Sequence, residues 1–242
     1  MKALFIHGIE DQGSSWEDTC AALDGIECVT PDLPWRMFTD FSWLREQAPD
    51  AAVAAELERV RPDLCVAHSF GALALIEALL HAPDAVRPRA LVLIAPFYLS
   101  ENERLDWLLL DRTRTEFTRL MRDSIVTRTQ RAGRKISEDI IEIMVTKVLS
   151  GINPLAFTEL FGHFSLMRRR PLEDLAIPGR LIGSEGDPGF AGSRARELGA
   201  RLGLELTLLP GRDHFLHYTA PKTVAETITE TIQSLLVKGN HE

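Results

Sequence analysis

The sequence lacks the usual features of a membrane protein or a nucleic-acid-binding protein. No apolar run in its 242 residues approaches the length of a membrane-spanning helix. The first residues, Met1 to Gly8, are too short and too soon interrupted to form a signal peptide. The formal net charge is −8, whereas phosphate-binding domains usually carry a basic surplus. We therefore expect a cytoplasmic protein with no membrane partner and no nucleic-acid partner.

Cysteine is scarce as well, with three residues, Cys20, Cys28 and Cys65. The count is odd, the spacing fits no zinc pattern, and the flanking residues are apolar, which is typical of buried free thiols in a reducing compartment. The histidines are scattered, and no two of them share a helix face beside a third ligand. No glycine-rich phosphate loop is present either. The sequence thus predicts no metal and no other cofactor.

Short apolar runs alternate with helical patterns along most of the chain. Strands are expected at Lys2–Ile6, Glu27–Thr30, Leu64–His68, Ala90–Ala95, Gly179–Ile182 and Glu205–Leu209. Helices are expected at Ser15–Leu23 (capped by Ser14 or Ser15), Pro49–Arg59, Gly71–Leu80, Ser193–Leu202 and Pro221–Leu236. This alternation predicts an α/β fold, a mostly parallel, doubly wound sheet of about six strands with helices on both faces.

The stretch from about Phe97 to Pro171 breaks this alternation. It holds no strand pattern, and apolar residues repeat at helical spacing over Ser137–Leu149. No linker-like composition separates it from the rest of the chain. We therefore expect a helical insertion at residues 98–171, packed on a core made of residues 1–97 and 172–242.

The strongest chemical motif is Cys-Val-Ala-His-Ser-Phe-Gly-Ala, residues 65–72. A strand runs into a small-Xaa-Ser-Xaa-Gly turn, and a helix begins at once. Such a turn exposes the hydroxyl of Ser69 above the sheet and places its neighbouring amides near a helix N-terminus. The small residues Ala67 and Gly71 let the strand and the helix approach closely. On the alternative interpretation Ser69 is only a helix cap; with the strand and helix in place, we predict a nucleophile.

A serine nucleophile needs a neighbouring base, and histidine is the natural one at neutral pH. His214 lies in Gly-Arg-Asp-His-Phe, directly after the last expected strand. It can reach Ser69 because the carboxyl ends of parallel strands meet at one edge of the sheet. The competing base is His217, about one helical turn further along and less well placed. Asp213, next to His214, is expected to bond within its own loop.

The acid that orients the histidine should lie between the serine and the histidine in the chain, at the end of the preceding strand. The segment Arg-Leu-Ile-Gly-Ser-Glu-Gly-Asp-Pro, residues 180–188, offers two candidates there. Glu185 is nearer to the strand, and its longer side chain could reach the histidine. Asp187 is two residues further along.

With these motifs the chain resembles the α/β-hydrolase superfamily, over roughly residues 2–97 and 178–236. The family's nucleophile turn is usually Gly-Xaa-Ser-Xaa-Gly, so Ala67 replaces its first glycine. The resemblance favours Asp187 over Glu185, because a Gly-Xaa-Xaa-Asp-like turn follows the strand. It also implies that the amides of Ile9 and Phe70 form an oxyanion hole. The His7-Gly8 pair then turns the first loop toward the substrate, with His7 itself structural.

In this family a helical insertion at this position usually forms a cap over the active site. Here it is rich in aromatic and flexible apolar side chains, which suit an apolar or aromatic acyl group. The candidate substrate contacts are Phe97, Trp107, Met121 and Phe161. Several arginines alternate with the apolar residues and are expected to form a solvated helix face, although one could turn inward to hold a substrate carboxylate: Arg112, Arg114, Arg119, Arg122 and Arg128.

The leading hypothesis is therefore a carboxylesterase or thioesterase that cleaves an acyl bond of a small apolar substrate through an acyl-Ser69 intermediate. A second hypothesis keeps the site and changes the reaction to carbon–carbon bond cleavage, cyclisation or another cofactor-free reaction. A third is a ligand-binding protein without catalysis. The expected partner is a small-molecule substrate, and a homodimer is compatible with the sequence.

Overall fold

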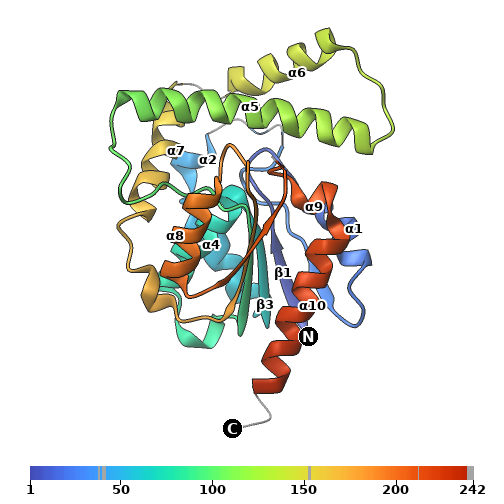
Figure 1. Ribbon diagram of the computed structural model, residues 1–242, viewed down its shortest axis with the longest axis vertical. Coiled ribbons are helices and arrows are strands. Elements are labelled where there is room, and N and C mark those ends of the chain that lie inside the picture. Colours follow the sequence, from blue (N-terminus) through green and yellow to red (C-terminus); the bar gives the residue numbers. More distant parts are fainter. Residues whose placement is uncertain (38, 40–41, 152–153, 212, 239–242) are drawn as a thin grey trace.

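The central element of the chain is a parallel sheet of six strands in the order β2-β1-β3-β4-β5-β6. It is seen in a computed structural model that describes residues 1–37, 39, 42–151, 154–211 and 213–238 (Figure 1). The strands are β1 (Lys2–Ile6), β2 (Glu27–Val29), β3 (Leu64–His68), β4 (Ala90–Ile94), β5 (Gly179–Ser184) and β6 (Glu205–Leu209). The α/β sheet predicted from the alternation of patterns is confirmed.

Helices cover both faces of this sheet and its carboxyl edge. In chain order the helices are η1 (Gly13–Trp16), α1 (Glu17–Ala21), α2 (Trp43–Glu46), α3 (Pro49–Val60), α4 (Ser69–His81), η2 (Asp84–Val86), α5 (Trp107–Arg131), α6 (Glu138–Gly151), α7 (Pro154–Met167), η3 (Leu172–Leu175), α8 (Gly192–Leu202), α9 (Leu216–Thr219) and α10 (Pro221–Lys238). Helices α1 and α10 pack together on one face, and α4 and α8 lie on the other (Figure 1). Every residue of β3 and β4 is buried, which explains their unbroken apolar sequences.

The ends of several elements differ from the sequence prediction. Strand β5 continues to Ser184, because Gly183 and Ser184 pair with the last residues of β6. The expected helix at 15–23 is a 3₁₀ turn, η1, followed by α1. Neither Ser14 nor Ser15 caps it, since Trp16 holds the N-cap position and makes no side-chain cap bond.

The three cysteines are free, as expected. Only Cys65, in the central strand β3, is fully buried, and burial raises the pKa of its thiol. Cys20 and Cys28 are half-buried, because α1 and the edge strand β2 lie nearer the surface than the sequence suggested.

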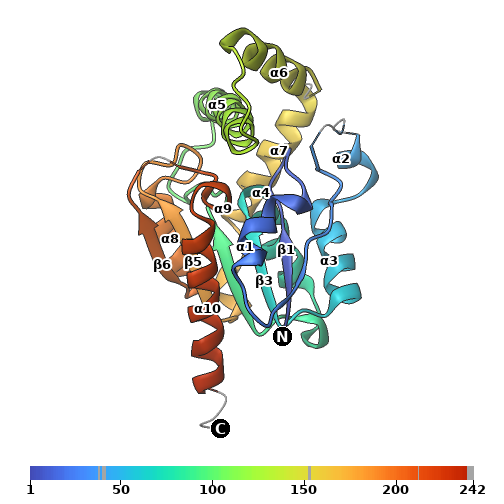
Figure 2. The same ribbon diagram turned by 90° about the vertical axis from the view of Figure 1, so that its right-hand side faces the viewer.

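The long stretch between β4 and β5 forms the helices α5, α6 and α7, so the helical insertion is confirmed. Helix α5 crosses above the carboxyl ends of the strands, with α6 packed on it and α7 leading back to the core (Figures 1 and 2). Among the residues described, no helix has the length and apolar character needed to cross a bilayer.

We expect Gly71→Ala to lower the free energy of unfolding by about 1–3 kcal/mol, because overpacking a closed site typically costs that much. A Cβ at Gly71 would lie 2.3 Å from the carbonyl oxygen of His7. Urea denaturation measures the change. The matched control is Gly162→Ala in α7, where an added Cβ meets nothing within 4 Å. That control should stabilise by about 0.5–1 kcal/mol, the usual gain from replacing a helical glycine. Equal losses in both variants would contradict a close approach at Gly71.

Candidate active site

Ser69 occupies the sharp turn between β3 and α4. Its φ of 51° lies in the left-handed region, which costs energy for any residue with a Cβ and is held only by the surrounding structure. Two glycines make room for the turn. A Cβ at Gly8 would lie 3.3 Å from the Cβ of Ser69, and a Cβ at Gly71 would meet the backbone of His7. The serine is therefore presented at the carboxyl edge of the sheet on a strained turn.

His214 and Asp187 meet Ser69 at this edge. The Nε2 atom of His214 lies 2.8 Å from the Oγ of Ser69, and its Nδ1 atom lies 2.7 Å from the Oδ2 of Asp187. Since a carboxylate only accepts hydrogen bonds, Nδ1 carries the hydrogen and Nε2 presents its lone pair to the serine hydroxyl. All three side chains are buried, with His214 4% and Asp187 1% exposed. The arrangement joins a nucleophile, a base and an orienting acid.

Asp187 is itself held in place by the loop after β5. Its Oδ1 atom accepts hydrogen bonds from the amides of Gly189 (2.7 Å) and Phe190 (3.1 Å), which leaves Oδ2 facing His214. Glu185, the alternative acid, is exposed to solvent. It lies next to the paired strand end, and its own amide bonds to Leu209, so the loop turns its side chain away. The structure thus brings Asp187 rather than Glu185 to the histidine.

His217, the competing base, does not reach the serine. Its Nε2 atom lies 3.0 Å from the Oδ2 of Asp11, and its ring lies between those of Trp16 and His68. It is buried, and its side chain on α9 contacts Asp11 and His68 rather than Ser69. Asp213 accepts a hydrogen bond from the amide of Phe215, and so holds its own loop as expected.

The loop after β1 is fixed by His7. The amide of Leu33 donates to Nε2 of His7, and Nδ1 of the same ring donates to the carbonyl oxygen of Gly8. Burial lowers the pKa of His7, which is consistent with this neutral form. Ile9 and Phe70 both line the cavity beside Ser69. The amide of Phe70 lies in the first turn of α4, where amides have no intrahelical acceptor. That the backbone amides of Ile9 and Phe70 form the oxyanion hole remains a prediction.

The cavity at Ser69 measures only about 20 Å³, close to the room that one water molecule needs. It is mostly apolar, and its lining residues are Ile9, His68, Ser69, Phe70, Phe97, Phe117, Leu120, Met121, Phe164, His214 and Phe215. Two of the four predicted substrate contacts, Phe97 and Met121, are among them. The helices α5 and α7 therefore close over the serine with apolar side chains.

The other two predicted contacts lie elsewhere. Trp107 begins α5 and is 83% exposed, on a separate surface groove outside the serine cavity. Phe161 is half-buried and packs against the apolar cluster around Phe117 and Phe157. Sequence reasoning did not select Phe117 or Leu120. Phe117 lies four residues before Met121 along α5, so the helical spacing would have found it once Met121 was placed. Leu120 is adjacent to Met121, and only the tertiary structure places it at the cavity.

The arginines of α5 lie in three kinds of environment. Those at 112, 114 and 119 are exposed, as expected of a solvated face. Arg122 forms ion pairs with Glu138 and Glu142 of α6. Arg128 does turn inward, but its guanidinium donates to the carbonyl oxygen of Glu10 at 2.6 Å. None of these arginines lines the described cavity at Ser69.

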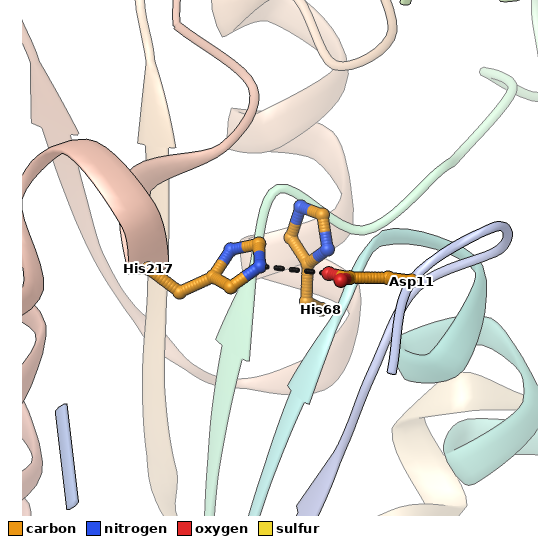
Figure 3. Close-up of side chains that lie close together, drawn as sticks. All are labelled: Asp11, His68 and His217. Carbon is orange, nitrogen blue, oxygen red and sulfur yellow. Dashed lines mark hydrogen bonds and ion pairs between the residues drawn. The ribbon is translucent and has the colours of Figure 1, made fainter. Parts of the chain in front are cut away.

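A second cluster of titratable side chains lies close to Ser69. Asp11, His68 and His217 come from distant parts of the sequence, and their polar atoms all lie within 4.8 Å of one another (Figure 3). Burial, with smaller contributions from the neighbouring histidines, lowers the pKa of His68 well below its usual range. No local spacing connects these residues, so sequence reasoning did not identify them as a group.

The sequence matches the model of the alpha/beta hydrolase family over residues 3–227. Among curated proteins, none matches the sequence. Three solved structures illustrate its likeness in fold. A meta-cleavage product hydrolase from Pseudomonas fluorescens has a TM-score of 0.66 and 15% identity, covering 97% of this chain and 91% of its own. A thioesterase domain from the curacin biosynthetic pathway has a TM-score of 0.60 and 21% identity, covering 94% of this chain and 90% of its own. An esterase from Thermogutta terrifontis has a TM-score of 0.59 and 14% identity, covering 97% of this chain and 90% of its own.

We expect Asp187→Asn to lower kcat on any ester substrate by about 10³- to 10⁴-fold, because an amide can donate to Nδ1 and so hold the imidazole in the wrong tautomer. Glu185→Gln is the matched control and should change kcat by less than about twofold, because a solvated side chain rarely contributes more. Steady-state kinetics on a short chromogenic ester gives both numbers. A large loss in the Glu185 variant alone would mean that the acid is assigned wrongly.

Proposed function

Because the chain belongs to the alpha/beta hydrolase family, we propose that it cleaves an ester, thioester or related acyl bond through an acyl-Ser69 intermediate. The observation that carries this proposal is the hydrogen-bonded series from Ser69 through His214 to Asp187, with distances of 2.8 and 2.7 Å. A serine at its ordinary pKa is a weak nucleophile, and such a base beside it is what makes it reactive.

The reaction begins when the Oγ of Ser69 attacks the carbonyl carbon of the substrate and His214 Nε2 takes the hydroxyl proton. Asp187 holds the ring and stabilises the imidazolium that forms. The amides of Ile9 and Phe70 donate to the oxygen that becomes negative, and one such donor is typically worth about 3–4 kcal/mol. His214 then returns the proton to the departing alcohol or thiol. A water molecule, activated by the same histidine, releases the acid product and restores Ser69.

The helices between β4 and β5 serve as a cap, which we assign to residues 98–171 over a core of residues 1–97 and 172–242. Four of its residues line the cavity at Ser69 from α5 and α7: Phe117, Leu120, Met121 and Phe164. A cavity of about 20 Å³ is smaller than an acyl group, so the cap must move to admit a substrate. The apolar lining favours a small apolar acyl chain.

Labelling with a fluorophosphonate tests the nucleophile directly, because the reagent phosphonylates an activated serine. We expect one labelled site in the wild-type protein, none in Ser69→Ala, and at least about 10³-fold slower labelling in His214→Ala, in line with the cost of removing a triad member. Ser14→Ala is the matched control, since Ser14 is exposed and far from the triad in the chain. It should label like the wild type.

Labelling that persists in Ser69→Ala would exclude this serine as the nucleophile. Pre-steady-state kinetics with a chromogenic ester then separates acyl transfer from the alternative reactions of the fold, such as carbon–carbon bond cleavage. A burst of about one product per chain indicates an acyl-enzyme. The complete absence of ester turnover in a protein that still labels at Ser69 would favour one of the alternatives.

The apolar lining that the cap contributes predicts how the length of the acyl chain affects the rate. Met121→Ala should raise kcat/KM for a hexanoyl ester relative to an acetyl ester by about tenfold, because each methylene accommodated in an apolar pocket is worth about 1–3 kcal/mol. Met121 is 5% exposed and lines the cavity. The control is Leu108→Ala, on the same helix but 67% exposed, which should leave the ratio unchanged. An equal ratio in the two variants would contradict a role of Met121 in substrate selection.

A further inference from the structure

Asp11, His68 and His217 form a buried cluster beside the triad, but separate from it. Asp11 lies in the loop after β1, His68 is the last residue of β3, and His217 lies in α9. They are 3%, 1% and 0% exposed. Figure 3 shows the three side chains converging, with the Nε2 atom of His217 3.0 Å from the Oδ2 of Asp11. One carboxylate and two imidazoles thus face a common point inside the protein.

The hydrogen-bond partners of His68 decide which of its nitrogens is free. Its Nε2 atom lies 2.9 Å from the carbonyl oxygen of His214, and since a carbonyl only accepts, Nε2 carries the hydrogen. Nδ1 therefore has a lone pair. It is buried and makes no hydrogen bond among the described residues, and in Figure 3 it lies on the side of Asp11. Leaving such an atom unsatisfied is costly, so a ligand for it is favoured.

Two hydrogen bonds fix the orientation of the Asp11 carboxylate, as is usual for a carboxylate that binds a metal ion. Its Oδ1 atom accepts from the Tyr218 hydroxyl at 2.6 Å and from the Gln12 amide at 3.0 Å, which leaves Oδ2 directed at the cluster. These two hydrogen bonds to Oδ1 fix the carboxylate group, so that Oδ2 faces the two imidazole rings (Figure 3).

We propose that Asp11 Oδ2, His68 Nδ1 and His217 Nε2 bind one divalent transition-metal ion of the zinc type. Two imidazole nitrogens and one carboxylate oxygen are a common protein ligand set for such ions, which keep a further coordination position open. Hard cations such as Mg²⁺ prefer all-oxygen ligands and are not expected here. The outer contacts also fit, because ligand histidines usually donate their second nitrogen to a carbonyl, as His68 does to His214.

Binding requires a change of tautomer at one residue. In the hydrogen-bonded pair the hydrogen on His217 Nε2 is shared with Asp11. The metal takes the Nε2 lone pair, and the hydrogen moves to Nδ1 of the same ring, so the neutral imidazole loses no proton overall. Nδ1 of His217 is buried without a hydrogen bond among the described residues and can carry it.

The consequence is structural. His68 directly precedes Ser69, and its ring lies 5.0 Å from that of His214 between centroids. A metal on His68 Nδ1 fixes the ring whose other nitrogen bonds the backbone of His214. It thereby fastens the nucleophile turn and the histidine loop to each other and to the loop after β1. The site does not depend on the proposed hydrolysis, because none of its three ligands belongs to the triad.

The test is zinc binding by the whole chain. Protein freed of metal with a chelator is mixed with zinc chloride, passed through a desalting column and analysed by mass spectrometry for metal. We expect about one zinc retained per chain and a higher thermal midpoint with zinc than without, since a ligand that binds only the folded state stabilises it. Magnesium chloride should give neither effect. Ser69→Ala should retain zinc even if it has no activity.

The decisive variant is His68→Gln. Its side-chain amide nitrogen takes the place of Nε2 and can still donate to the carbonyl of His214, but the Nδ1 ligand is gone. We expect zinc affinity to fall about 100-fold or more in this variant and in Asp11→Asn, since even outer contacts are worth 10- to 100-fold. His81→Ala is the matched control, because that histidine is exposed on α4 and outside the cluster. It should retain the full zinc content.

Two results would overturn the proposal. One is a wild-type protein that retains no zinc, and the other is equal retention in His68→Gln and His81→Ala. Circular dichroism confirms that the variants fold. If they do not, cobalt(II) absorption of the wild-type protein decides. Strong visible bands of a low-coordinate nitrogen and oxygen site support the proposal, and the weak spectrum of hydrated cobalt contradicts it.

Discussion

The close approach of β1 to the start of α4 is the constraint on which the rest of the structure depends. Ser69 has a left-handed backbone with φ of 51°, and such a conformation persists only when its surroundings hold it. Gly71 lies against the carbonyl of His7, and Gly8 lies against Ser69 and His68. Larger residues at either glycine would separate strand from helix. The strained turn, the presentation of the hydroxyl and the position of the neighbouring amides all follow from this contact.

A parallel sheet then brings the remaining groups to the same place. The carboxyl ends of β3, β5 and β6 lie along one edge, so loops that are far apart in the chain meet there. Asp187 and His214 each arrive from such a loop, and Asp187 is held by two amides. The bond from His68 to the carbonyl of His214 ties the nucleophile strand to the histidine loop. Orientation is therefore set by the backbone around the triad as much as by the triad itself.

The cap contributes the apolar environment. Phe117 and Met121 of α5 and Phe164 of α7 close over the serine, while the exposed Trp107 at the start of α5 does not take part. In the reaction that we propose, exclusion of water would strengthen the electrostatic interactions of the triad and the amides during acyl transfer. The small cavity would also limit the size of the acyl group. On this proposal the sheet edge supplies the chemistry, and the insertion, which has the least diagnostic sequence, supplies the selectivity.

The sequence by itself determined the order of the elements, the helical insertion, and the candidacy of Ser69 and His214, because these depend on local patterns of apolar residues and turns. The ends of some elements differ from the prediction because strand pairing in the sheet sets them, as at Ser184 in β5. The resemblance to a family already favoured Asp187 over Glu185, but only the tertiary structure brings Asp187 to His214. Only the tertiary structure separated the cavity residues from the other candidates and gathered Asp11 with two histidines. The physical reason is that these outcomes depend on which way a loop turns and which distant side chains it meets, and no local spacing records either.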